Sequence, residues 1–288
     1  MKKLVLYHDN CPDGFGAAWV VRRALGEAAV EFHAAIYNRP PPAFAGRDVI
    51  MVDFCLQRPE MEQLTNQASS ILVLDHHESA QKAMAGLTAP NLMTVFDMDK
   101  SGVGVAWSHF FPGEPMPRLL QHVQDMDIWR WRLPGTAEVM SALLSHPYDF
   151  ALWDLLMQKV GKLRREGVGI RRAREKETQD LLRAGKGLRA TIGGYDVPVF
   201  NAPFMFAKLA HMAAEHGEPF GATFWLLSTP AGPRVKFSLR SSSNGLNVAD
   251  IAAQYGGGGH AHAAGFEVPL DVAVKMLFPV AIPAVVAA

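Results

Sequence analysis

Short apolar runs alternate with helix-like segments over about the first 110 residues of the chain. The runs at residues 4–7, 49–52 and 71–74 are almost continuously apolar, as is typical of parallel strands that are covered on both faces. Because helix-like segments separate these runs, the pattern predicts βαβ units around a mostly parallel sheet flanked by helices.

The pattern becomes helical from Met116 to about Gly185. Residues 161–183 are rich in Arg, Lys and Glu and lack proline, which favours a solvated connecting helix over a nucleic-acid-binding stripe. Four tryptophans lie before and within this region, and we expect them to pack in a core: Trp107, Trp129, Trp131 and Trp153.

Strand and helix patterns return after the linker Gly185-Lys186-Gly187. They predict strands at 189–192, 197–200, 223–227 and 235–239 and a helix over 204–216. We therefore expect an α/β fold with two lobes. An N-terminal domain would occupy residues 1–150, a helical connector 151–186 and a smaller C-terminal α/β domain 187–288, which suits a length of 288 residues.

The composition narrows the function without naming it. Lys and Arg number 28 and Asp and Glu number 28, so no net charge draws the chain onto a long duplex, although short or small anions remain candidate ligands. Two cysteines exclude a disulfide scaffold and a multi-cysteine zinc site. The apolar stretches at both ends are too short for a membrane span, so we expect a soluble, cytoplasmic protein.

Polar side chains follow the three predicted strands directly: His8, Asp53 and Asp75. In an open α/β sheet, ligands bind beyond the carboxyl ends of the strands, so these three residues are expected to meet in one crevice. An unpaired buried carboxylate at Asp53 would be costly, which indicates a cation or several donors beside it.

Further candidate ligands have ordinary structural alternatives. Asp75-His76-His77 taken alone is equally well a turn with two solvated histidines. The loop from His8 to Ala18 carries Asp13 and the small residues Gly14 and Gly16, which allow close backbone approach to a ligand but are also common in turns. Asp125 and Asp127 offer two more carboxylates, either of which could instead cap a helix.

Histidines with several carboxylates and few thiolates suit manganese or magnesium better than structural zinc. Two such ions about 3.5 to 4 Å apart, bridged by one carboxylate, would activate water for attack on phosphorus.

A second glycine-rich element lies near the C-terminus. Gly256 to Gly259 are consecutive glycines, whose N–H groups could form a nest for an anion, or simply a flexible loop. Arg240, at the start of Arg240-Ser241-Ser242-Ser243, and His260 would add charge-assisted hydrogen bonds to phosphate.

Together these motifs resemble the DHH phosphoesterase superfamily over nearly the whole chain. The resemblance is carried by Asp75-His76-His77, by the loop from His8 to Gly14, by Asp53, and by Gly257-Gly258-Gly259-His260 with Ala263-Ala264-Gly265, which is similar to the DHH-associated substrate domain. It implies a dinuclear manganese site in the N-terminal lobe, with magnesium or cobalt as alternatives. It also implies a phosphate-gripping C-terminal lobe that includes Arg240, Ser241, Gly257, Gly258, Gly259 and His260.

Residue by residue, the resemblance implies that His8 and Asp53 bind one ion. Asp13, Asp53, His76 and one of Asp125 or Asp127 would bind the other, with Asp53 as the bridge. Asp75, His76 and His77 are the implied catalytic residues, and His77 would orient ligands or substrate. The family usually has an aspartate where Cys11 stands, so either Cys11, Asp9 or Asn10 would complete the first ion's site, or that ion would be held weakly.

The order Pro12-Asp13-Gly14-Phe15-Gly16 with Asp127-Ile128-Trp129 is similar to stand-alone nano-RNase-like phosphoesterases. The leading hypothesis is release of nucleoside monophosphates from very short oligonucleotides. The alternatives are hydrolysis of linear or cyclic dinucleotides, 3′-phosphoadenosine-type nucleotides or polyphosphate, and, in another class, a non-catalytic nucleotide sensor. A homodimer is one option for the assembly.

Overall fold

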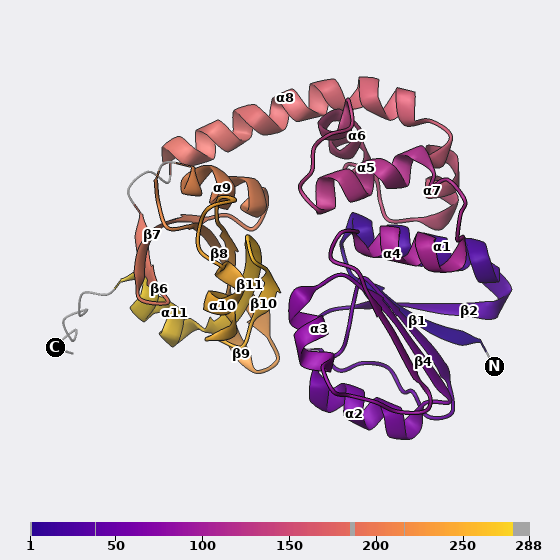
Figure 1. Ribbon diagram of the computed structural model, residues 1–288. Helices are drawn as coiled ribbons and strands as arrows, with labels where there is room; N and C mark the ends of the chain where they lie inside the picture. The colour runs from indigo at the N-terminus through magenta and orange to yellow at the C-terminus, as the bar shows by residue number, and fades with distance from the viewer. Residues whose placement is uncertain (1, 38, 185–187, 216, 279–288) are drawn as a thin grey trace. The chain divides into compact units, whose positions relative to one another are not determined.

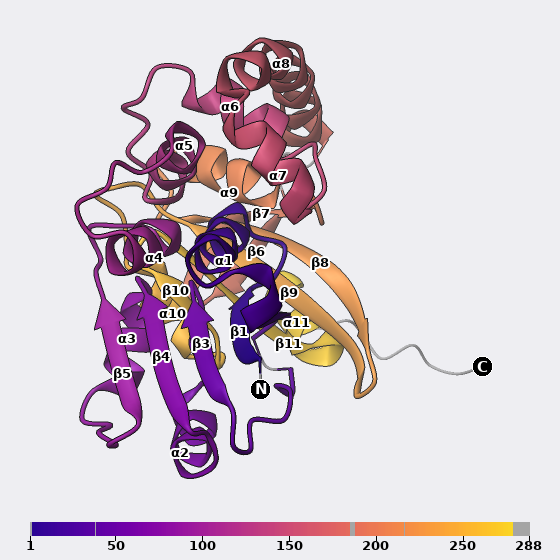
Figure 2. The same ribbon diagram turned by 90° about the vertical axis from the view of Figure 1, so that its right-hand side faces the viewer.

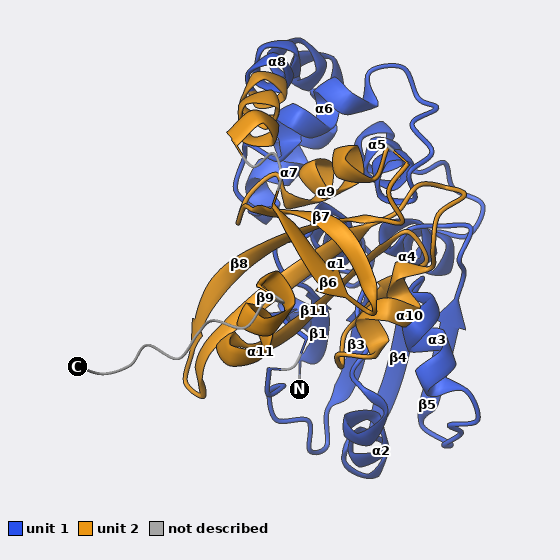
Figure 3. Cartoon of the chain, turned by 90° about the vertical axis from the view of Figure 1, so that its left-hand side faces the viewer, with its two compact units in different colours: residues 1–173 blue, residues 174–288 orange. Residues whose placement is uncertain are grey.

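The structure, a computed structural model, describes residues 2–37, 39–184, 188–215 and 217–278 (Figure 1). The chain forms two compact units, residues 1–173 and 174–288 (Figure 3). The linker predicted at Gly185-Lys186-Gly187 lies outside the described residues. Within the described parts of the chain, no helix combines the length and apolar character needed to cross a membrane.

The N-terminal unit contains a five-stranded sheet in the order β2-β1-β3-β4-β5, in which every pairing is parallel. Its strands are β1 (Lys3–His8), β2 (Val30–Ala35), β3 (Asp48–Val52), β4 (Ser70–Asp75) and β5 (Leu92–Phe96). Figure 2 shows β3, β4 and β5 ending at the same edge of the sheet. The parallel sheet predicted from the apolar runs is confirmed.

Helices cover both faces of this sheet. Helices α1 (Pro12–Leu25) and α4 (Gly102–Phe110) cover one face, and α2 (Arg58–Gln67) and α3 (Glu78–Met84) cover the other. Helix α5 (Arg118–Asp127) packs on α1 and α4, and α6 (Thr136–Leu143) and α7 (Phe150–Met157) pack on α5; a short 3-10 turn lies at Glu27–Ala29. Val5 packs in one core cluster, whereas Leu4 and Leu6 pack in the other. Since successive side chains of a strand point to opposite faces, two covered faces explain the unbroken apolar runs.

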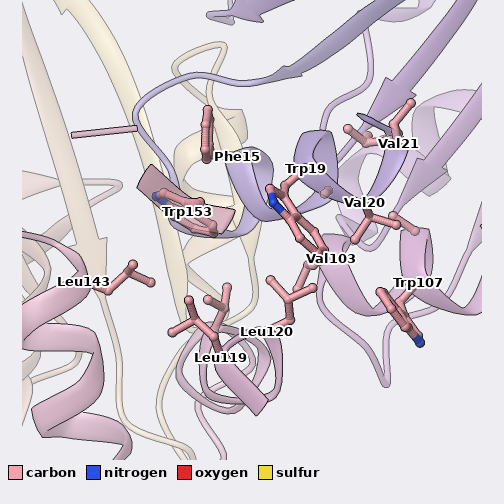
Figure 4. Packing of buried hydrophobic residues seen from close by; sticks show 14 of the residues in the cluster. Phe15, Trp19, Val20, Val21, Val103, Trp107, Leu119, Leu120, Leu143 and Trp153 are labelled. Atoms are coloured by element: carbon pink, nitrogen blue, oxygen red, sulfur yellow. The ribbon is translucent and has the colours of Figure 1, made fainter. Parts of the chain in front are cut away.

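The larger cluster places two of the four expected core tryptophans. Figure 4 shows Trp107 and Trp153 among its aliphatic residues, and they are only 6% and 0% exposed. The prediction is wrong for Trp129 and Trp131, which are 52% and 41% exposed. Both lie in the loop after α5, outside the packed helices.

Helix α8 (Val160–Ala184) matches the helix predicted over 161–183, and the boundary between the two units falls within it. The C-terminal unit contains a six-stranded mixed sheet in the order β10-β11-β9-β8-β7-β6. Its elements are β6 (Arg189–Ile192), β7 (Tyr195–Asn201), α9 (Phe206–Ala214), β8 (Gly221–Thr229), β9 (Gly232–Arg240), α10 (Val248–Ala253), β10 (Gly258–His260), β11 (Ala263–Pro269) and α11 (Leu270–Leu277). The predicted two-lobed α/β fold is confirmed.

Candidate metal centre

The polar residues at the carboxyl ends of β1, β3 and β4 lie together in the N-terminal unit. Tyr7 pairs with Val52, and Val52 pairs with Leu74, so the three strands end side by side. As a result, His8 Nδ1 lies 3.6 Å from Asp53 Oδ2, and His76 Nε2 lies 3.1 Å from Asp53 Oδ1. The strand-end pattern in the sequence therefore predicted a real cluster.

Asp53 stands at the centre of this cluster in an unusual backbone conformation. Its φ is 52°, in the left-handed region that residues other than glycine rarely adopt, and its N–H donates to Leu74 O at 3.0 Å. The side chain is 1% exposed. Backbone strain of this kind is typical of functional sites, where surrounding contacts hold the residue in place.

Asp13 enters the cluster from the start of α1, which begins at Pro12, a favoured first helical residue. Its carboxylate accepts hydrogen bonds at the N-terminus of α4, from Ser101 Oγ at 2.6 Å, Gly102 N at 2.5 Å and Val103 N at 3.0 Å. The N-terminal helix dipole favours a negative charge at this position. These donors fix Asp13 Oδ2 at 3.7 Å from His76 Nε2.

Two glycines allow these elements to approach one another. A Cβ at Gly14 would lie 2.5 Å from His8 O, and a Cβ at Gly102 would lie 2.7 Å from Asp53 Oδ1. Both distances are far below ordinary van der Waals contact. The glycines therefore let α1 and α4 begin directly against the ends of the strands.

The Asp75-His76-His77 segment directs two histidines into the site. Asp75 Oδ1 accepts from the backbone N–H of His76 at 2.7 Å and lies 2.7 Å from His77 Nδ1. This contact fixes the ring of His77, as expected for a residue that orients ligands. His76 Nε2 lies within 3.1 to 3.7 Å of carboxylates from Asp53, Asp127 and Asp13.

Of the two candidate carboxylates at the end of α5, the structure brings Asp127 into the cluster, with Oδ2 3.5 Å from His76 Nε2. Asp125 does not join it. Its carboxylate accepts from Arg132 N at 2.8 Å, Leu133 N at 3.0 Å and Thr136 Oγ1 at 2.6 Å. Residues two apart on a helix differ by about 200°, so the two carboxylates point in different directions. Of the two alternatives Asp125 and Asp127, the geometry therefore favours Asp127 as the candidate ligand.

Cys11 lies beside His8 and Asp53, as the candidate ligand for the first ion should. Potential ligand atoms of His8, Cys11 and Asp53 all lie within 4.8 Å of one another, whereas Asp9 belongs to no such group of described residues. Burial, followed by the charges of Asp53, Asp127 and Asp13, raises the pKa of the Cys11 thiol well above its ordinary value. Without a cation, Cys11 therefore stays a neutral thiol.

The carboxylates of the cluster have more acceptor oxygens than the described hydrogen-bond donors fill. The cluster contains four carboxylates, and among the described residues three of their buried oxygens accept no hydrogen bond: Asp53 Oδ2, Asp75 Oδ2 and Asp127 Oδ2. Burial and neighbouring carboxylates raise the pKa values of Asp13 and Asp127. Burial acts in the same direction on Asp53, but the neighbouring His76 and His8 outweigh it and hold the pKa of Asp53 well below its usual range.

Unpaired carboxylate oxygens in a buried site are costly unless they coordinate a cation. The observed donors are carboxylate oxygens, imidazole nitrogens and one thiol. This mixture of oxygen, nitrogen and sulfur donors fits a divalent cation. The residues present therefore fit a divalent metal centre.

The C-terminal unit aligns two of the predicted phosphate-binding residues. His260 pairs with Ala263, and Ala263 pairs with Arg240, so Arg240 and His260 project from one face of the sheet with a small residue between them. Arg240 Nη1 donates to Ser238 Oγ at 3.2 Å and to Leu239 O at 2.7 Å. Burial lowers the pKa of Arg240 to about 10.

Part of the glycine run has a structural role in its own unit. Gly256 N donates to Ala253 O at 3.1 Å and Gly257 N to Ala252 O at 3.0 Å, so both N–H groups close the end of α10. A Cβ at Gly259 would lie 2.5 Å from Ala263 O, which makes glycine necessary for the close pairing of β10 with β11. Gly258 lies in the same strand.

Ser241 is likewise engaged within its own unit. Its Oγ donates to Leu246 O at 2.7 Å and lies 2.9 Å from His262 Nδ1, and the residue is 3% exposed. The geometry therefore favours Arg240 and His260, rather than Ser241 and the first glycines, as groups for an anion.

Comparison with known proteins matches part of the C-terminal unit to a family model. Residues 205–279 match the family model described as the DHHA1 domain. Over 283 residues the chain is 29% identical to the uncharacterized protein R106 of Acanthamoeba polyphaga mimivirus, and the match covers 91% of this chain and 66% of that protein's length.

Solved structures with similar folds include RecJ in complex with Mn²⁺ from Thermus thermophilus. It is 17% identical, with a TM-score of 0.47 over 94% of this chain and 50% of RecJ. Another is the pGpG-specific phosphodiesterase PggH from Vibrio cholerae, which is 13% identical, with a TM-score of 0.43 over 96% of each chain. Both TM-scores are below 0.5, so no argument is based on these two likenesses.

Proposed function

We propose that the chain is a metal-dependent phosphodiesterase of the DHH phosphoesterase superfamily, to which the DHHA1 match at residues 205–279 points, and that it releases nucleoside monophosphates from very short oligonucleotides. The observation that carries this proposal is the cluster of buried carboxylates at the strand ends, with three oxygens that accept no hydrogen bond from described residues. Such a cluster has no evident packing role, and it suits the binding of divalent cations.

In this proposal, His8, Cys11 and Asp53 hold one divalent ion. Asp13, His76 and Asp127 would hold the other together with Asp53, whose Oδ1 lies 3.1 Å from His76 Nε2, so that Asp53 would be shared. Manganese is the proposed metal, with magnesium and cobalt as alternatives. Bound there, a pair of such ions would lower the pKa of a water molecule and neutralise charge on the phosphate undergoing attack.

The chain's own residues supply positioning. Asp75 holds the ring of His77 through Nδ1, which leaves Nε2 as the atom that can meet substrate or ligands. The α4 N-terminus holds Asp13 through three hydrogen bonds, so its carboxylate needs little reorganisation. Arg240 and His260, on one face of the C-terminal sheet, would bind a substrate phosphate that is not being cleaved.

The balanced charge favours a short substrate, because binding many phosphates requires an excess of Lys and Arg. We therefore propose short oligonucleotides or small phosphoesters as substrates rather than long duplexes.

The test is release of mononucleotide from a 5′-phosphorylated diribonucleotide in the presence of Mn²⁺, followed by chromatography. The natural chain is compared with Asp75→Asn, which keeps the shape of the side chain but weakens its hold on His77. Rapid release that is lost in the variant supports the proposal. No release by a chain shown to bind Mn²⁺ would contradict it, and would direct the same assay to polyphosphate and to cyclic dinucleotides.

A further inference from the structure

The loop after α5 presents two tryptophans to solvent. Trp129 is 52% exposed and Trp131 is 41% exposed, and their rings meet edge to face, with centroids 5.2 Å apart and planes at 83°. An indole carries a large apolar surface, which a soluble protein ordinarily buries. Two of them exposed side by side therefore point to a binding role.

This loop is built rather than loose. Asp125 organises it with four hydrogen bonds: its carbonyl accepts from the N–H groups of Arg130 and Trp131, and its carboxylate from those of Arg132 and Leu133. Arg130 Nη2 also donates to Asp99 O at 2.7 Å.

Trp129 and Trp131 both adopt left-handed backbone conformations, with φ of 57° and 52°. This conformation is a marked outlier for a bulky side chain and costs about 1 to 3 kcal/mol for each residue. The contacts of Asp125 hold the loop against that strain, so the exposed position of the indoles is enforced by the surrounding structure.

The position of the loop and its charged residues indicate which kind of ligand the indoles could bind. Trp129 follows the cluster residue Asp127 by two positions, so their Cα atoms lie no more than about 7 Å apart. Arg130 and Arg132 alternate with the indoles and are exposed. Aromatic faces interleaved with cationic side chains are the combination that binds the bases and the anionic backbone of single-stranded nucleic acids.

We propose that the exposed face of Trp129 is a stacking subsite for a nucleobase of the substrate, with Trp131 supporting it from the edge. The edge-to-face arrangement of the two rings means that one base stacks on one ring, rather than lying between both. The proposal rests on the proposed function and makes it more specific, because a polyphosphate chain has no aromatic face to stack.

The test is calorimetric binding of AMP and of ribose 5-phosphate, which differ by the base, to the full-length chain saturated with Mn²⁺. A stacked base is worth about 5- to 150-fold in affinity, so the natural chain is expected to bind AMP more tightly than ribose 5-phosphate by a factor in that range. Trp129→Ala is expected to bind the two ligands alike, and Trp129→Phe to keep most of the preference. Leu155→Ala, which removes a 54% exposed side chain from α7, is the matched control.

Equal affinity of the natural chain for AMP and ribose 5-phosphate would overturn the subsite. So would a Trp129→Ala variant that weakens both ligands equally or loses Mn²⁺, since the loop would then serve only to position Asp127. Diribonucleotide turnover by the natural chain is measured in parallel. Turnover without a base preference refutes the subsite alone, whereas a base preference without turnover refutes the proposed function alone.

Discussion

Replacing Gly102 with alanine should disable the metal centre without removing any ligand atom. The added Cβ would lie 2.7 Å from Asp53 Oδ1, about 0.7 Å inside the 3.4 Å at which ordinary contact begins, and it would be closer still to Asp53 Cβ. Asp53 or the start of α4 must therefore move by roughly 1 Å. The start of α4 also carries the N–H groups that hold Asp13, so either movement displaces a ligand.

A displacement of roughly 1 Å at a catalytic site can cost about 100-fold in rate. Overpacking costs about 1 to 3 kcal/mol of stability, which the helix preference of alanine over glycine partly offsets. We therefore expect Gly102→Ala to fold, to bind Mn²⁺ more weakly and to lose about 100-fold in diribonucleotide turnover. Calorimetry, thermal melting and the chromatographic assay measure these three effects.

Gly169→Ala is the matched control, because a Cβ at Gly169 meets nothing within 4 Å on the exposed surface of α8. It should keep both metal affinity and turnover. If Gly102→Ala binds Mn²⁺ and turns over substrate within about twofold of the natural chain, the close packing of Asp53 against α4 is not what positions the ligands.

Three further outcomes follow from the contacts in the two units. Asp125→Ala should lower the free energy of unfolding by about 1 to 3 kcal/mol, because it leaves buried donors without a hydrogen-bond acceptor. Asp127→Asn should instead weaken Mn²⁺ binding, with a smaller change in melting temperature. Equal effects of the two variants on stability and on Mn²⁺ binding would refute the separate roles. Burial lowers the pKa of His76, but Asp53, Asp127 and Asp13 together raise it to about 10. Mn²⁺ binding at pH 7 should therefore release a proton, and the affinity should weaken about tenfold for each pH unit below that. Calorimetry in buffers of different ionisation enthalpy measures the released proton, and finding none would contradict this prediction. Arg240→Ala should raise KM about tenfold or more while changing kcat less. Arg234 is the control residue, because its guanidinium donates to Glu267 O, and Arg234→Ala should leave KM unchanged.

The sequence predicted the strands whose apolar runs are almost unbroken. Strands β1, β3 and β4 are covered on both faces, so their runs are continuously apolar. Because these strands are parallel, the residues that follow them lie together at the carboxyl ends of the strands. Strands β2 and β5 lie at the edges of the sheet and are partly exposed, and their mixed sequences gave no comparable signal.

The choice between Asp125 and Asp127 depends on the rotation of α5 relative to the cluster. The spacing showed that the two residues face different ways, but it could not show which of them faces the metal ligands. The exposure of Trp129 was hidden for a related reason. A left-handed backbone at a tryptophan depends on the hydrogen bonds of Asp125 to the loop, and residue preferences do not encode those bonds.

The sequence indicated one role for the glycines near the C-terminus, whereas the structure shows other roles for three of them. Their composition indicated free N–H groups for an anion, yet Gly256 and Gly257 close a helix and Gly259 allows two strands to pair closely. Glycine satisfies each of these demands equally well, so its presence alone could not separate them.

We propose that the buried carboxylate and histidine cluster binds divalent cations through a shared Asp53. The most direct test of this claim is a calorimetric titration of Mn²⁺ into the chelator-treated chain, natural and Asp53→Ala. We expect two ions to bind the natural chain and tight binding of both to be lost in the variant. Absence of tight binding to the natural chain, or the same stoichiometry and affinity in Asp53→Ala, would contradict the claim.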